Sequence, residues 1–170
     1  MTSFIALLRA VNVGGTGKLA MADLKTICEA AGFRSVRTYI ASGNVVFASK
    51  LDEAAVRKKL EARLLAHAGK PVPVMIRTAA EIAEVLAKNP FAEAPGNRTV
   101  AIFLDEAPPA DALATLSGRV DERVGLGRRE IYVAYGPNMA SSTLKIPAAK
   151  TGTARNMNTI AKLASMAAGL

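Results

Sequence analysis

The sequence holds few of the residues that build metal sites and many catalytic sites. Its 170 residues include one cysteine, Cys28, and one histidine, His67. A single cysteine excludes an intramolecular disulfide and fits a reducing compartment. Zinc sites need several cysteine or histidine ligands, so we expect no metal, and we expect no cofactor either. Only His67 could serve as the histidine of a catalytic triad.

Tryptophan is absent, aromatic residues amount to 5% of the chain, and long apolar runs are missing. The apolar run that starts at Phe4 stops at Arg9, which is too short for a secretory signal. No stretch approaches the roughly 18 apolar residues of a membrane span. We therefore expect a soluble, cytoplasmic protein with no membrane partner. Hydrophobic residues still make up 51% of the sequence, which favours a folded core.

Positive charge is in excess, with a net charge of +8 and a pI of about 9.9. Residues 1–78 hold 12 basic and 5 acidic side chains, residues 123–170 hold 7 and 1, and the segment between them holds 3 and 8. Two basic segments thus flank an acidic one. This distribution favours an anionic partner such as a nucleotide or a nucleic acid. A solvated basic surface without a ligand is the alternative.

Residues 1–78 carry the pattern of a split β-α-β unit. The pattern predicts a strand over 3–9, a helix from Met21, a hairpin over 35–48, a helix after Asp52 and a strand over 72–76. This β-α-β-β-α-β order is that of the ferredoxin-like fold, an antiparallel sheet with two helices on one face. Cys28 lies on the apolar stripe of the first helix and is predicted to be a core thiol.

A connecting helix and loop over 79–96 are predicted to lead into a second α+β half over 97–170. There the pattern predicts strands over 99–104, 120–126 and 130–135, a short helix over 108–116 and a last helix over 156–168. The segment 139–152 has no clear assignment. Since the order β-α-β-β-α echoes the first half, we predict an α+β protein of two ferredoxin-like halves packed together, with mainly antiparallel sheets.

A loop with three glycines and a lysine separates the first strand from the first helix. A phosphate-binding P-loop requires glycine at position 12 and serine or threonine at position 19. This chain has Asn12 and Leu19 there, so that class of ATPase is excluded. A looser nest of backbone N–H groups for an anion and a sharp turn without a ligand both stay open. The candidate anion-binding residues here are Arg9, Asn12, Gly14, Gly15, Gly17 and Lys18.

Two further polar clusters are candidate sites. Arg155 and Asn156 stand just before the last helix, where their position favours either a helix cap or a phosphate site. Tyr39 and Asn44 belong to the hairpin. If Arg37 and Tyr39 face the open side of the sheet, that face resembles the base-binding surface of RNA-recognition modules, although the chain lacks their run of aromatic residues.

Six stretches spread along the chain carry a resemblance to a known family. They are LLRAVNVGG at 7–15, MADL at 21–24, VRTYIASGNVVF at 36–47, NPF at 89–91, REIY at 129–132 and TARNMNT at 153–159. With them the chain resembles a bacterial family catalogued as domain of unknown function 1697. Members of that family often have glycine at the position of Ala10 and tryptophan at that of Met157. The resemblance implies paired ferredoxin-like halves in a cytoplasmic bacterial protein, and it implies no activity.

Three hypotheses of function follow from these features. In the first, the basic surface and the Gly14–Lys18 loop bind a phosphate-bearing ligand, either a nucleotide or a nucleic acid. In the second, the protein is a small metal-independent enzyme acting on an anionic metabolite held by Arg9, Lys18 and Arg155. In the third, it is an interaction or structural protein, in which the acidic middle of one copy meets a basic segment of another. The oligomeric state is not set by the sequence.

Overall fold

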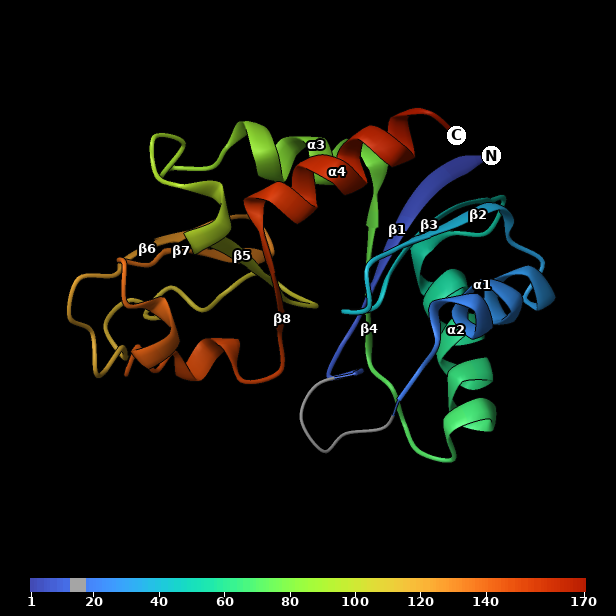
Figure 1. Ribbon diagram of the computed structural model, residues 1–170, viewed down its shortest axis with the longest axis horizontal. Helices are drawn as coiled ribbons and strands as arrows, with labels where there is room; N and C mark the ends of the chain where they lie inside the picture. The colour runs from blue at the N-terminus through green and yellow to red at the C-terminus, as the bar shows by residue number, and fades with distance from the viewer. Residues whose placement is uncertain (13–17) are drawn as a thin grey trace. The chain divides into compact units, whose positions relative to one another are not determined.

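The structure, a computed structural model, describes residues 1–12 and 18–170 (Figure 1). The chain forms two compact units. Unit 1 comprises Met1–Ala83 together with Lys162–Leu170, and unit 2 comprises Glu84–Ala161. The helices α3 (Ala79–Ala87) and α4 (Met157–Ala168) each contribute residues to both units. The domain boundaries expected from the sequence, at residues 78 and 96, stay a prediction.

Unit 1 has the element order that its sequence predicts. The elements are β1 (Thr2–Leu8), α1 (Met21–Ala30), β2 (Arg34–Tyr39), β3 (Asn44–Ser49), α2 (Glu53–Ala68) and β4 (Val74–Thr78). The strands form an antiparallel sheet in the order β2-β3-β1-β4, so β1 pairs with both β3 and β4. This is the ferredoxin-like arrangement. The predicted α+β class with antiparallel sheets is confirmed.

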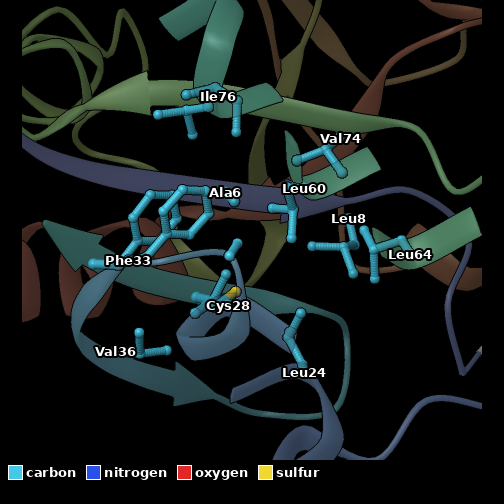
Figure 2. Packing of buried hydrophobic residues seen from close by; sticks show 14 of the residues in the cluster. Ala6, Leu8, Leu24, Cys28, Phe33, Val36, Leu60, Leu64, Val74 and Ile76 are labelled. Carbon is cyan, nitrogen blue, oxygen red and sulfur yellow. The ribbon is translucent and has the colours of Figure 1, made fainter. Parts of the chain in front are cut away.

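The core of unit 1 lies between its sheet and the helices α1 and α2. Successive residues of a strand point to opposite faces, so Ala6 and Leu8 share the helix-facing side of β1. They lie in one buried cluster with Leu24 and Cys28 of α1 and Leu60 of α2 (Figure 2). Burial raises the pKa of the Cys28 thiol to about 12. Cys28 is therefore a core side chain, as its position on the apolar stripe predicts.

The ends of α2 are set by local side-chain and backbone chemistry. At the start, Asp52 Oδ1 accepts a hydrogen bond from the Ala55 N–H at 2.8 Å. At the end, Gly69 adopts a left-handed conformation with φ of +73°, which suits glycine because it has no Cβ. Between these caps, Val56, Leu60 and Leu64 face the sheet. The helix therefore ends next to the loop that leads into β4.

Unit 2 contains a second antiparallel sheet. Its strands are β5 (Thr99–Phe103), β6 (Arg123–Leu126), β7 (Glu130–Ala134) and β8 (Thr153–Asn156). They pair in the order β6-β7-β5-β8, which repeats the order of the first sheet strand for strand. A 3-10 turn at Gly96–Arg98 precedes β5, and the connection from β7 to β8 contains two further 3-10 turns, at Met139–Ser141 and Pro147–Ala149, instead of a long helix.

One prediction for the second half is wrong, and one strand there was not predicted. No helix forms over 108–116; bonds between residues three apart, such as Ala112 N–H to Pro109 C=O at 3.0 Å, close successive turns instead. A short helix needs an apolar face packed on a core, and here Ala112 is buried while Leu113 stays 46% exposed. The strand β8 was not predicted, because its sequence Thr-Ala-Arg-Asn lacks apolar alternation, and pairing with β5 creates it.

Each sheet carries a buried arginine at the same place. Arg77 of β4 lies opposite Ile5 of β1, and Arg155 of β8 lies opposite Ala101 of β5. In both arginines, Nη1 donates to the carbonyl of the preceding residue at 2.9 Å. In both, a capping residue and a helix follow directly. The two units therefore share an internal structural repeat, of which the sequence shows only the echoed order of elements.

Candidate anion-binding site

The segment that follows β1 has two residues in the left-handed region. The Arg9 N–H donates to the Pro73 carbonyl at 2.9 Å, which holds the end of β1 against the start of β4. Ala10 and Asn12 then have φ of +56° and +55°. An alanine is strained in this conformation, whereas asparagine and glycine tolerate it. The backbone thus gives a reason for glycine at position 10 in proteins that resemble this chain.

The side chain of Asn12 forms hydrogen bonds with two other segments of the chain. Its Nδ2 donates to the Leu19 carbonyl at 2.7 Å and to the Ala41 carbonyl at 2.8 Å, and its Oδ1 accepts from the Leu19 N–H at 2.7 Å. Both amide N–H groups are thereby used. Asn12 joins the end of β1 to Leu19, two residues before α1, and to the β2–β3 turn, so it acts as a positioning residue beside the candidate site.

A basic cavity lies where the end of β1, the end of α2 and the loop before β4 meet. Its volume is about 350 Å³. Arg9 and Lys18, two of the residues that the sequence singles out, line it together with His67 and Lys70. Its remaining walls are apolar, formed by residues such as Leu19, Leu64, Val72, Pro71 and Pro73. No acidic side chain is among the described residues that line it.

The charged side chains that line this cavity are all basic. Among the described residues, no carboxylate forms an ion pair with Lys18, His67 or Lys70. The C-terminal carbonyls of α2 oppose these charges, but a helix end is equivalent to only about half a negative charge. Arg9, Lys18 and Lys70 contribute three full positive charges at neutral pH. The cavity therefore favours an anion.

Three of the predicted ligand residues, Gly14, Gly15 and Gly17, lie outside the described residues. Their assignment to a backbone anion nest stays a prediction. The cavity is defined by residues on either side of them in the sequence, Arg9 and Lys18.

The hairpin residues serve the turn itself. Asn44 is fully buried, and its Nδ2 donates to the Tyr39 carbonyl at 2.9 Å and to Ser42 Oγ at 2.8 Å. Tyr39 is half-buried at the end of β2. Neither residue lines the basic cavity. Their assignment as ligand residues stays a prediction.

The central strands of the first sheet offer no open aromatic face. Ile5, Leu7 and Val46, which point away from α1 and α2, are fully buried. The aromatic rings lie in the core on the opposite side, where Phe33 stacks on Phe47 with ring centroids 4.3 Å apart. Modules that stack RNA bases need exposed aromatic rings on the sheet. These strands lack that feature.

Arg155 and Asn156 occupy a different environment from the basic cavity. Asn156 Oδ1 accepts from the Thr159 N–H at 2.9 Å and caps α4. Arg155 is buried, and its Nη1 donates to Thr153 Oγ1 at 2.7 Å as well as to the Ala154 carbonyl. Burial lowers the pKa of its guanidinium to about 10. Arg155 does not line the basic cavity, so of the three predicted anion-binding residues Arg9, Lys18 and Arg155 only the first two lie together there.

His67 and Lys70 are the cavity residues that sequence reasoning missed. Nothing local links residues 67–70 to residues 9–18. The predicted fold did contain the signal: an antiparallel β1–β4 pair places the residue after Leu8 beside the residue before Val74, and Leu8 and Val74 are indeed partners. The chain that runs into β4 must therefore pass the end of β1.

The described part of the chain contains no helix that is both long and apolar enough to cross a membrane. In the same residues, no group of three or more His, Cys, Asp or Glu side chains could hold a metal ion.

Fold and site together define an α+β protein with two sheets of identical strand order and a basic cavity at the end of its first strand. The chain belongs to the family described as protein of unknown function (DUF1697), whose model matches residues 1–132. Its structure is similar to that of the conserved bacterial protein SP0830 from Streptococcus pneumoniae, with 25% sequence identity, a TM-score of 0.81 and coverage of 98% of both chains. No curated protein matches the chain.

Proposed function

We propose that the protein binds a phosphate-bearing small molecule in the basic cavity. One observation carries the proposal: four basic side chains line a single cavity that has no acidic residue among its described walls. A phosphate ester carries up to two negative charges and several acceptor oxygens. Guanidinium and ammonium groups are the side chains that bind such anions best.

The size of the cavity supports a small ligand over a nucleic acid. Its volume of about 350 Å³ lies within the range of small-molecule sites. Nucleic acids are held instead by charges spread along an extended surface, and single-stranded RNA also by stacking on exposed aromatic rings. The central strands of the first sheet present no such rings. A small phosphate-bearing molecule is therefore a better candidate than a nucleic acid.

Charge attraction alone accounts for modest affinity. At a separation of about 4 Å, one cation and one phosphate charge attract by about 1 kcal/mol in water and about 4 kcal/mol at a partly buried protein surface. With three such cations around a phosphate, we expect inorganic phosphate to bind with a dissociation constant near the millimolar range, which corresponds to about −4 kcal/mol. An organic group on the phosphate adds contacts with the apolar walls.

The test is a titration of the 15N-labelled protein followed by amide chemical shifts. Inorganic phosphate and adenosine monophosphate should shift the amides of Arg9, Lys18 and Leu19, whereas adenosine without phosphate should not. Lys18→Gln and Lys70→Gln should each weaken phosphate binding by about tenfold, because each removes one cation of the cavity.

Lys25→Gln is the matched control, since Lys25 is exposed on α1 and does not line the cavity. The proposal is wrong if the cavity variants bind phosphate as well as the Lys25→Gln protein does. Labelled oligonucleotides titrated at low and high salt test the nucleic-acid alternative, which requires strong binding at low salt that weakens steeply as salt is raised.

A small metal-independent enzyme is the second candidate, favoured by the position of His67. The only histidine of the chain lines the same cavity as Arg9 and Lys18. Histidine is well suited to transfer protons near neutral pH. Under this hypothesis, His67→Gln abolishes turnover of an anionic substrate while phosphate still binds. Equal loss of binding and turnover in that variant contradicts a catalytic role.

A further inference from the structure

A second cavity adjoins the basic one along the outer side of α2. Its volume is about 520 Å³, and it lies between α2 and the segment that precedes β4. Pro71, Val72 and Pro73 line both cavities. The two cavities therefore share a wall of three residues.

Four charged side chains line this second cavity, Glu53, Arg57, Lys58 and Glu61, and the structure gives partners to three of them. Arg57 and Glu53 form an ion pair one helical turn apart, with 3.9 Å between Nη2 and Oε2. Glu61 Oε2 accepts a hydrogen bond from the Val74 N–H at 3.0 Å. The remaining surface is mostly aliphatic and includes Leu65, which is 46% exposed although it is a large apolar side chain. An uncharged, apolar group fits this surface better than a second charge.

We infer that the ligand is a phosphate monoester whose apolar organic group extends from the basic cavity across Pro71–Pro73 into the second cavity. The inference rests on the proposed function, since the phosphate in the basic cavity anchors the ligand. The apolar group gains affinity by covering Ala62 and Leu65 of α2. A ribose is disfavoured there because Glu53, Arg57 and Glu61 are already engaged by partners within the protein, so the ribose hydroxyl groups lose water without full compensation.

The test compares methyl, propyl and hexyl phosphate, each titrated as a monomer below its micelle concentration. Full burial of one methylene raises affinity by about fourfold. Partial burial of the five added methylenes should make hexyl phosphate bind at least about 20-fold more tightly than methyl phosphate. Ala62→Trp should fill the second cavity and abolish this gain, while methyl phosphate binds as it does to the unmodified protein.

Ala66→Trp is the matched control, because Ala66 is exposed on the same helix and lines neither cavity. It should keep the full chain-length dependence, and thermal unfolding of both tryptophan variants verifies that they fold. The inference is overturned if hexyl phosphate binds no more tightly than methyl phosphate, if Ala62→Trp keeps the gain, or if adenosine monophosphate binds more tightly than hexyl phosphate. If Lys18→Gln leaves the affinity for methyl phosphate unchanged, the proposed function itself is overturned, and this result is separate from those above.

Discussion

Removal of the Asn12 side chain should destabilise the protein through loss of its hydrogen bonds and, for most replacements, through backbone strain. Asn12 makes three hydrogen bonds of 2.7–2.8 Å, two of them with the backbone of Leu19 and one with the Ala41 carbonyl. Its φ of +55° lies in the left-handed region. Leu19 is buried, so loss of Asn12 Oδ1 leaves a backbone N–H without its partner.

The expected magnitudes separate the two effects. A hydrogen bond contributes about 1 kcal/mol, and the bond to Ala41 counts for less because it is exposed to water. Asn12→Gly keeps the backbone relaxed, so we expect it to lower the free energy of unfolding by about 2 kcal/mol. Asn12→Ala also forces a Cβ into the left-handed region, and we expect about 1 kcal/mol more. Asn12→Asp keeps the acceptor but places a carboxylate against two carbonyl oxygens, so the Asn12→Asp protein should be no more stable than the Asn12→Gly protein.

Urea denaturation followed by far-UV circular dichroism measures these differences as shifts of the unfolding midpoint. The order of stability should be unmodified protein, then Asn12→Gly, then Asn12→Ala. An Asn12→Gly protein within about 0.5 kcal/mol of the unmodified one refutes the hydrogen-bond argument. Equal stability of the glycine and alanine variants refutes the strain argument and leaves the hydrogen bonds as the only contribution.

Three further predictions follow from single residues. Ala10→Gly should stabilise the protein by up to about 1 kcal/mol in urea denaturation, because glycine relieves a positive φ; a destabilised variant contradicts this. Glu122 accepts from Ser142 Oγ and the Val120 N–H, which lowers the pKa of its carboxyl to about 2 from 4.5. Its stabilising contribution is therefore complete above pH 4.5 and is lost as the pH falls towards 2, so Glu122→Gln should be less stable at pH 7, by a margin that shrinks over that range. The Cys28 thiol should react with a thiol reagent only as the protein unfolds, so its labelling rate should rise through the urea transition.

The local sequence predicted those elements whose stabilising interactions lie close along the chain. Thr78 and Glu81 have the spacing of a capping box at the start of α3, and the structure contains that box, with hydrogen bonds of 2.8 and 3.1 Å. The apolar stripe of α1 and the β2–β3 hairpin are present as predicted. The predicted helix over 108–116 does not form because little of its apolar side is buried. The strand β8 forms although its own residues give no strand signal, since β5 supplies its partners.

The sequence by itself determined the α+β class and the ferredoxin-like order of the first 78 residues, and it singled out Arg9, Asn12 and Lys18 as candidate site residues. Those conclusions need only periodicity, turn chemistry and composition, which act over a few residues. Tertiary structure alone decided what surrounds them. Pairing of β1 with β4 carries His67 and Lys70 to the cavity that Arg9 and Lys18 line. Pairing of β5 with β8 places Arg155 in the second sheet as the counterpart of Arg77 in the first. Such groupings depend on contacts between residues far apart in the chain, and no local pattern records them.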